Sequence, residues 1–222
     1  MLVKICGAGS VREVRDVAAA GAGLVGLWHG VPGGRADLPA GRLTELAAAA
    51  RETGRLESVL VTFASDAAVL ADVAARAAVD WVQLHGYQPP ATVRALRRLL
   101  PKGARVVKVL HVRDGSCVEA PLIGAYERAG TDAFLLDAVA ADGRVGSTAQ
   151  SLDDAVVTGL ADRMQRPFLL AGGLDADNRG RFGAAVAHPR FLGIDVDSAA
   201  RDGDGLLAAA RAAAVVHAWR DA

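Results

Sequence analysis

Short apolar runs alternate with longer Ala-, Leu- and Arg-rich segments through the whole chain, and this alternation limits the folds open to it. The runs are continuous rather than interleaved with polar residues, as in parallel strands covered on both faces. The segments between them have the apolar spacing of helices. The expected strands are Leu2–Cys6, Leu24–Trp28, Ser58–Phe63, Trp81–His85, Arg105–Leu110, Ala133–Asp137, Phe168–Ala171 and Phe191–Val196. The expected helices are Val11–Ala20, Leu43–Glu52, Ala67–Ala77, Thr92–Leu100, Ala120–Arg128, Leu152–Arg163, Asp177–Ala187 and Leu206–Trp219.

Eight strand–helix units predict a closed (β/α)8 barrel, the TIM-barrel architecture of the α/β class. The 222 residues are slightly fewer than the roughly 250 typical of this fold. An open doubly wound sheet, usually of about five or six strands, is the alternative. However, Gly7-Ala8-Gly9 lacks the third glycine of a dinucleotide-binding turn. No linker, low-complexity stretch or charge block divides the sequence, so we expect one barrel domain over residues 1–222.

The charge balance argues against a general nucleic-acid binder. Twenty-five basic residues are matched by twenty-five acidic ones, whereas such a protein shows a basic excess. The hydrophobic content of 52% predicts a buried core rather than a disordered chain. No apolar run reaches the roughly 18–20 residues of a membrane span without a charged residue or glycine. We therefore expect neither nucleic acid nor membrane as a partner.

The cysteines and histidines predict a reducing compartment and no metal site. Cys6 and Cys117 are too few for a disulfide framework, and the first residues resemble a strand rather than a leader. We therefore expect a cytoplasmic protein. His29, His111 and His188 share no metal-ligand spacing, so neither a metal ion nor another cofactor is expected.

Chemically active side chains stand where the expected strands end. Enzymes with this barrel carry their reacting groups at the carboxyl ends of the strands. Cys6 ends the first strand and Asp137 ends the sixth, so a thiol and a carboxylate would face each other across the mouth. This arrangement suits proton transfer between neighbouring atoms of a small substrate.

Five motifs stand at these strand ends. They are Lys4-Ile5-Cys6-Gly7, Gln83-Leu84-His85-Gly86, Leu135-Leu136-Asp137, Leu170-Ala171-Gly172-Gly173-Leu174 with Asn178, and Gly193-Ile194-Asp195-Val196. With these motifs the sequence resembles the phosphoribosylanthranilate isomerase family of tryptophan synthesis. The motifs occur in the family's order and span nearly the whole chain.

The resemblance implies an Amadori rearrangement, in which an N-linked aminoaldose becomes a 1-amino-1-deoxyketose. By the family pattern, Asp137 is the acid that opens the furanose ring and Cys6 is the base that removes the C2 proton. A thiol with an unperturbed pKa of about 8.5 is mostly protonated at neutral pH. Lys4, two residues earlier on the same strand face, is a candidate source of positive potential.

The remaining site residues follow from the same resemblance. The substrate-binding set is Lys4, Arg35, His85 and Asp195, in which Arg35 holds the anthranilate carboxylate and Asp195 assists substrate hydroxyls. The phosphate-binding set is Gly146, Ser147, Gly172, Gly173, Asp197 and Ser198. The expected partner is thus a small aminoaldose with an aromatic carboxylate, bound by a monomer or homodimer.

Each assignment has a structural alternative. Cys6 would then be a packing residue, Asp137 a carboxylate bonded to backbone amides, and Arg35 a solvated loop residue. Cys117 lies apart from every motif and is expected to be structural, and Trp81 and Trp219 are expected to pack in the barrel or its helices.

The sequence departs from the family at the phosphate end. Ser147 and Ala149 stand where the family has glycines, and Tyr87-Gln88 replaces an acidic residue. Asp197 stands where the family has serine. Its carboxylate would either repel a phosphate or cap a short helix that begins at Ser198.

Three functions are therefore open at this stage. The first is an authentic phosphoribosylanthranilate isomerase. The second is a paralogue with the same barrel and Cys/Asp pair that acts on a different substrate, with or without a phosphate, in specialised metabolism. The third is a catalytically silent barrel that binds a ligand or partner protein, against which the presence of Cys6 and Asp137 argues.

Overall fold

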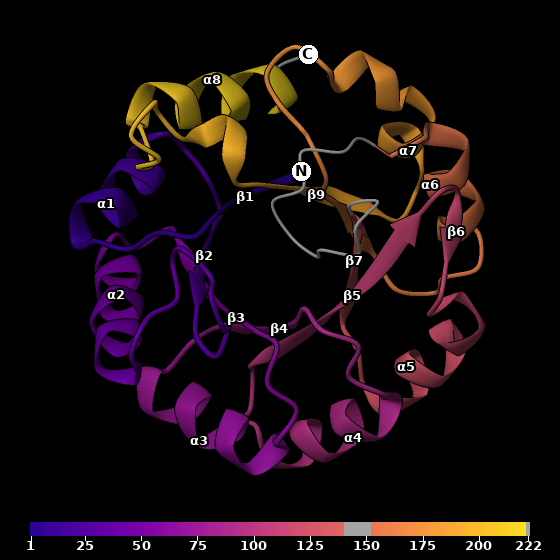
Figure 1. The fold of residues 1–222 in the computed structure, drawn as a ribbon, viewed down its shortest axis with the longest axis horizontal. Coiled ribbons are helices and arrows are strands. Elements are labelled where there is room, and N and C mark those ends of the chain that lie inside the picture. Colours follow the sequence, from indigo (N-terminus) through magenta and orange to yellow (C-terminus); the bar gives the residue numbers. More distant parts are fainter. Residues whose placement is uncertain (140–151, 221–222) are drawn as a thin grey trace.

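The computed structural model describes residues 1–139 and 152–220 and shows a closed barrel of parallel strands (Figure 1). The strand order is β4-β3-β2-β1-β9-β8-β7-β5, and pairing of β4 with β5 closes the barrel. The prediction of a single (β/α)8 barrel is confirmed. The strands are β1 (Leu2–Cys6), β2 (Leu24–Trp28), β3 (Glu57–Thr62), β4 (Trp81–Leu84), β5 (Arg105–Arg113), β6 (Ser116–Cys117), β7 (Ala133–Ala138), β8 (Phe168–Leu170) and β9 (Phe191–Val196).

The helices form a ring outside the strands (Figure 1). Several begin at side chains that accept hydrogen bonds from free amides, as Ser10, Asp66 and Asp153 do. The α-helices are α1 (Val11–Ala19), α2 (Ala40–Glu52), α3 (Ala67–Ala77), α4 (Pro90–Leu99), α5 (Ile123–Ala129), α6 (Asp154–Ala161), α7 (Gly183–Ala187) and α8 (Ala209–Arg220). The short 3-10 helices are η1 (Ala120–Leu122), η2 (Arg179–Phe182) and η3 (Ser198–Ala200).

The seventh helical segment differs from the prediction. A continuous helix over Asp177–Ala187 was expected, but the structure has η2 followed by the short helix α7. The side chain of Asn178 donates to the Gly173 carbonyl at 2.7 Å instead of joining a helix. Gly180 and Gly183 also lower the helical preference of this stretch, because glycine loses the most backbone freedom in a helix.

The fifth strand is longer than expected and turns back on itself. β5 continues past Leu110 to Arg113 and pairs antiparallel with β6. The connecting residues Asp114 and Gly115 both have positive φ, of 50° and 74°. Asp-Gly is a favoured pair for such a two-residue hairpin turn, so the sequence held a signal that the strand–helix alternation obscured.

Alternating strand residues divide the buried side chains into two layers. On β1, Val3 and Ile5 join the core between strands and helices, whereas Cys6 faces the barrel interior. Trp81 and Trp219 are both buried, as expected. Polar side chains also lie buried in the barrel strands, notably Lys4, Gln83, Lys108 and Asp195. The interior is therefore apolar in part and charged in part.

Within the described residues, the helices are too short or too polar to cross a membrane.

Close approach of β1 and β9 predicts that Gly193→Ala destabilises the fold. A Cβ at Gly193 would stand 1.9 Å from the Leu2 carbonyl oxygen, which belongs to backbone that cannot move away. We expect a loss of about 3 kcal/mol or more in the free energy of unfolding, measured by urea denaturation.

Gly159→Ala is the matched control. No heavy atom lies within 4 Å of a Cβ built there, and the residue is inside α6. Because alanine is the better helix former, this variant is expected to gain up to about 1 kcal/mol. Equal unfolding midpoints for both variants would contradict the prediction.

Candidate active site

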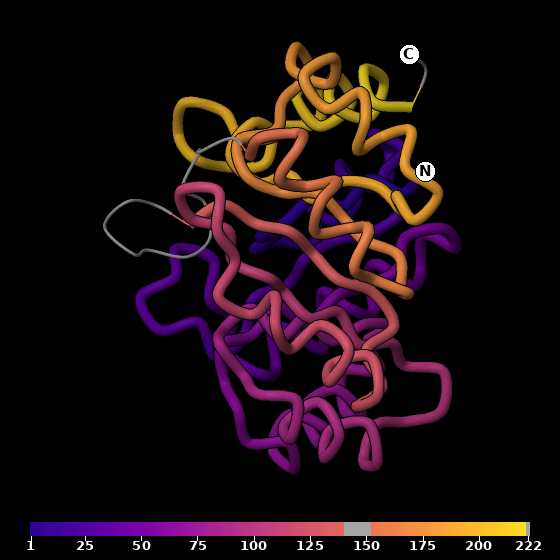
Figure 2. The backbone as a smooth tube through the Cα atoms, turned by 90° about the vertical axis from the view of Figure 1, so that its right-hand side faces the viewer, coloured from indigo at the N-terminus to yellow at the C-terminus, as the bar shows by residue number. Residues whose placement is uncertain are grey.

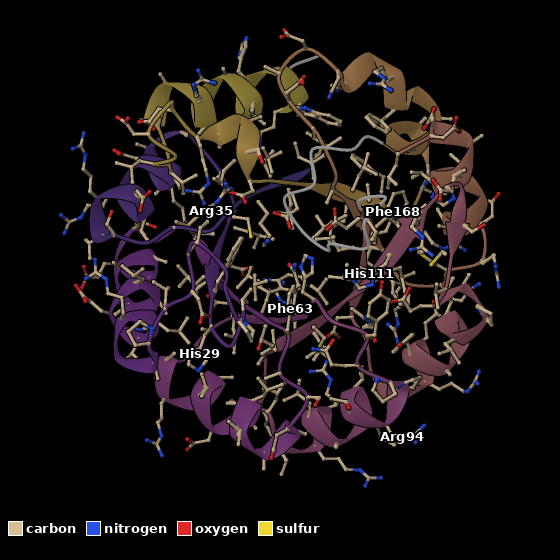
Figure 3. The ribbon with its side chains drawn as sticks, viewed as in Figure 1. His29, Arg35, Phe63, Arg94, His111 and Phe168 are labelled. Atoms are coloured by element: carbon tan, nitrogen blue, oxygen red, sulfur yellow. The ribbon has the colours of Figure 1, made fainter. Side chains whose placement is uncertain are left out.

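Polar side chains from β1, β4, β7 and β9 gather at the carboxyl ends of the strands. Cys6, His85, Asp137 and Asp195 are all buried there, each no more than 8% exposed. Figure 3 shows Arg35, Phe63 and His111 around this mouth, with Arg94 far outside it. In Figure 2, the loops that follow β2 and β9 extend on the same side of the molecule. Barrel closure thus unites groups that are distant in sequence.

Lys4 stands between Cys6 and Asp195. Its Nζ donates to Cys6 Sγ at 3.1 Å and to Asp195 Oδ2 at 2.7 Å. Burial alone would lower the pKa of Lys4, but Asp195 and Cys6 raise it above its usual value. Lys4 is therefore a buried cation, and the sequence-based expectation that it lies beside Cys6 agrees with the geometry.

The thiol of Cys6 is nevertheless protonated at neutral pH. Burial, together with the nearby carboxylates of Asp195 and Asp197, raises its pKa to about 11 against the opposing effect of Lys4. Asp195 holds Lys4 in the shorter contact, so part of the lysine's charge is already balanced. Lys4 therefore helps the thiolate less than the sequence alone suggested.

Trp28 at the end of β2 supplies a second donor to the sulfur. Its indole Nε1 lies 3.1 Å from Cys6 Sγ. Gly26 makes room for the sulfur, because a Cβ there would be 2.5 Å from Sγ. The sequence analysis missed Trp28, since the register of two neighbouring strands decides which side chain faces Cys6.

His85 and Asp137 form the other half of the site. His85 Nε2 lies 3.3 Å from Asp137 Oδ2, within ion-pair distance but not aligned for a hydrogen bond. Gln83 Nε2 is 3.0 Å from His85 Nδ1. When Gln83 donates this bond, the imidazole proton lies on Nε2 and faces Asp137.

Asp195 offers an oxygen to the interior. Its Oδ1 is buried and has no hydrogen-bond partner within the described part of the chain. Burial raises the pKa of Asp195, although Lys4 opposes this effect. A buried acceptor without a partner is costly, so this oxygen is a natural contact for a substrate hydroxyl.

Arg35, Asp197 and Arg201 form a charged bridge between the loops that follow β2 and β9. Asp197 Oδ2 accepts from Arg35 Nη2 at 2.6 Å, and Oδ1 accepts from Arg201 Nε at 2.6 Å. The helix-cap alternative for Asp197 is wrong, since its side chain makes no capping bond to η3. Both carboxylate oxygens are instead occupied by guanidinium groups, which offset the charge expected to repel a phosphate.

Arg201 is the second residue that the sequence analysis missed. It is buried, and its Nη2 donates to the carbonyls of Cys6 and Gly7 at 3.2 and 2.8 Å. A Cβ at Gly7, where φ is +82°, would be 2.4 Å from this nitrogen. The opposite charges at Asp197 and Arg201, four residues apart, were the available signal.

The expected phosphate-binding residues are described only in part. Gly172 and Gly173 follow β8 with φ of +89° and +61°, a conformation that favours glycine. Ser198 begins η3 after the neighbouring strand β9. Gly146, Ser147 and Ala149 lie outside the described residues, so the structure does not address them.

Within residues 1–139 and 152–220, no cluster of three His, Cys, Asp or Glu side chains could hold a metal ion.

Comparisons with known proteins agree with the fold and motifs. The family model of N-(5'-phosphoribosyl)anthranilate (PRA) isomerase matches residues 4–217. A protein named N-(5'-phosphoribosyl)anthranilate isomerase from Afipia carboxidovorans is 36% identical over 202 residues, covering 89% of this chain and 80% of the relative. A protein of the same name from Azorhizobium caulinodans is 33% identical over 222 residues, which cover 99% of this chain and 92% of that relative.

A solved structure supports the architecture. The phosphoribosyl anthranilate isomerase of Thermus thermophilus superposes with a TM-score of 0.79 at 22% identity, covering 98% of each chain. Together with the match of the family model over most of the sequence, these likenesses show that the chain belongs to the N-(5'-phosphoribosyl)anthranilate isomerase family.

Proposed function

We propose that this protein converts N-(5'-phosphoribosyl)anthranilate into the corresponding 1-amino-1-deoxyketose, without a cofactor, as a cytoplasmic enzyme of tryptophan synthesis. The observation that carries the proposal is the buried thiol and carboxyl pair at the mouth of a barrel of this family. A thiol and a carboxyl group can together move the two protons that the rearrangement requires.

The first step opens the sugar ring. Asp137, in its carboxylic acid form, donates a proton to the furanose oxygen while the C1–O bond breaks. The anthranilate nitrogen lone pair forms the C1=N bond, which gives an iminium ion. His85, 3.3 Å from the Asp137 carboxyl group, keeps that group turned toward the mouth.

The second step moves a proton from C2. The thiolate form of Cys6, a minor fraction at neutral pH, accepts it, and the C–H electrons form a C1=C2 bond as the iminium nitrogen recovers its lone pair. The resulting enaminol takes up a proton at C1 from the Cys6 thiol and passes its hydroxyl proton to the Asp137 carboxylate, which gives the 2-ketose and restores both groups. Lys4 and Trp28, each 3.1 Å from Sγ, stabilise the thiolate in this step.

Residues that follow different strands would hold the two ends of the substrate. Arg35 is half exposed and has one Nη engaged by Asp197, which leaves further N–H donors for the anthranilate carboxylate. Loop residues Gly172, Gly173 and Ser198 would bind the phosphate, and the free Oδ1 of Asp195 would accept a sugar hydroxyl.

The pairing of Asp197 bears on the alternative substrate. A carboxylate aimed at the phosphate was the main argument for a non-phosphorylated substrate. Arg35 and Arg201 each contact this carboxylate at 2.6 Å, so the bridge carries two positive charges against one negative. The proposal of a phosphorylated substrate therefore needs no change.

Removal of either proton-transfer group should abolish most of the turnover. Cys6→Ala and Asp137→Asn are each expected to lower kcat by about 10²–10⁴-fold with little change in KM, because the groups act on protons rather than on binding. Steady-state kinetics with phosphoribosylanthranilate measure this. Cys117→Ala is the control and should keep wild-type kcat. Near-normal turnover in Cys6→Ala or Asp137→Asn would remove that residue from the mechanism.

The environment of the Cys6 sulfur predicts how the rate of its alkylation depends on pH. In a Cys117→Ser background, the rate of reaction with iodoacetamide should rise tenfold per pH unit and level off near a pKa of about 11. Trp28→Phe should move the midpoint to still higher pH, because one donor to the thiolate is lost. Trp81→Phe, whose indole bonds Glu57 instead, should leave it unchanged. A wild-type midpoint near 8.5 would contradict the prediction.

Arg35→Lys should weaken binding of a carboxylated substrate. One ammonium group cannot bond Asp197 and also reproduce the two-pronged contact of a guanidinium with a carboxylate. We expect KM to rise about tenfold while kcat stays within about twofold. Arg12→Lys, at a fully solvated position on α1, is the control. An unchanged KM for Arg35→Lys would place Arg35 outside the site.

A further inference from the structure

Three charged side chains beside the site have no part in the mechanism above. Lys108 and His111 on β5 and Glu119 beyond β6 are all buried, at 0%, 2% and 4% exposed. Glu119 Oε1 lies 2.6 Å from His111 Nδ1 and 3.7 Å from Lys108 Nζ. Its other oxygen accepts from the His111 backbone N–H at 3.2 Å. The Asp114-Gly115 hairpin brings Glu119 back against β5.

The hydrogen bonds define the charge of this cluster. Burial alone would raise the pKa of Glu119, but His111 and Lys108 hold it below its usual value, so Glu119 is a carboxylate. A carboxylate only accepts, hence His111 Nδ1 donates. His111 Nε2 lies 2.9 Å from the His85 carbonyl oxygen, which also only accepts. Both ring nitrogens thus face acceptors, an arrangement that an imidazolium ion, with a proton on each nitrogen, satisfies.

The other titratable groups around His111 do not change this balance. Burial raises the pKa of Tyr87, whose ring centroid is 4.5 Å from that of His111, and brings the pKa values of Cys117 and Tyr126 to about 11 and 12. All three are neutral at pH 7. Asp137, the register partner of His111 on β7, and Arg113 farther along β5 complete the charged surroundings. Burial lowers the pKa of Lys108 to about 8, against the pull of Glu119.

Both cations reach the same loop. Lys108 Nζ donates to the Gly86 carbonyl at 2.7 Å, one residue after the carbonyl that His111 holds. Side chains of β5 thus bind two consecutive backbone carbonyls after β4. One of these carbonyls belongs to His85, whose imidazole ring faces Asp137. Figure 3 shows His111 beside the mouth, where β5 ends.

We propose that Lys108, His111 and Glu119 form a buried charge clamp that positions His85 against Asp137, with His111 as an obligate imidazolium donor to the β4 loop. The kinetic part of this inference rests on the proposed function, whereas the charge state of His111 does not. His111 is a positioning residue, since it contacts the His85 backbone rather than the reacting atoms.

The first experiment reads the charge state directly. Two-bond 1H–15N NMR spectra of 15N-histidine-labelled wild-type protein at pH 7 should show both ring nitrogens of His111 in the protonated form. The resonance is assigned by its loss in His111→Asn and its presence in His188→Asn. Glu119→Gln should convert His111 to the neutral ring, because the carboxylate that balances its charge is gone.

The second experiment separates the two hydrogen bonds of His111. Asparagine places its amide near the Nδ1 position and glutamine near the Nε2 position, so His111→Asn loses the bond to the His85 carbonyl while His111→Gln keeps it. We expect kcat to fall about tenfold in His111→Asn and to stay within about threefold in His111→Gln, with KM little changed in both. The His85 ring resonances should shift in His111→Asn and stay near wild type in His111→Gln.

A neutral His111 ring in the wild-type protein at pH 7 would overturn the proposal. Equal kcat values and equal His85 resonances in His111→Asn and His111→Gln would overturn the positioning role. Failure of the proposed function is distinguishable, because it would abolish the effect of Cys6→Ala and leave the NMR results unaltered.

Discussion

The ion pair between Lys4 and Asp195 joins the first barrel strand to the last, and the chemistry at the mouth depends on it. Both side chains are buried, and their contact of 2.7 Å lies beside Cys6. Each charge would be very costly inside the barrel without the other, so loss of either partner would leave an uncompensated ion. The pair therefore fixes a cation 3.1 Å from the Cys6 sulfur, close enough to oppose the rise in the pKa of that thiol.

The other charges of the site are likewise paired with opposite charges. Asp197 is held between Arg35 and Arg201, and Glu119 is held between Lys108 and His111. In each group a carboxylate is bound by two cations, at least one of which comes from another element. Because charge-assisted hydrogen bonds are short and directional, these groups set the positions of loops that helix packing alone would leave adjustable. These ion pairs thus hold loops around the proposed proton-transfer pair, Cys6 and Asp137.

The departures from the family pattern look different once the neighbours are known. Asp197 seemed to oppose a phosphate, yet its oxygens face two guanidinium groups. Tyr87 seemed to mark a lost acidic residue, yet its ring lies against His111. In each case one partner is remote in sequence: Arg35 for Asp197 and His111 for Tyr87. A residue's charge, taken alone, was a poor guide to its effect.

The sequence by itself determined the barrel and the chemistry-bearing strand ends. The strand–helix alternation predicted every strand of the barrel. The motifs singled out Cys6, Asp137, His85 and Asp195. These residues lie at the carboxyl ends of strands, which places them at the mouth of such a barrel. Some local features were also readable but missed, as with the Asp114-Gly115 turn. Only the tertiary structure decided the partners: Trp28 on Cys6, Arg35 on Asp197, and His111 on the His85 carbonyl. These contacts depend on strand register and loop closure, which bring together side chains separated by up to 195 positions, as Cys6 and Arg201 are. No local pattern encodes such distances, because the interaction energy exists only after the barrel has closed.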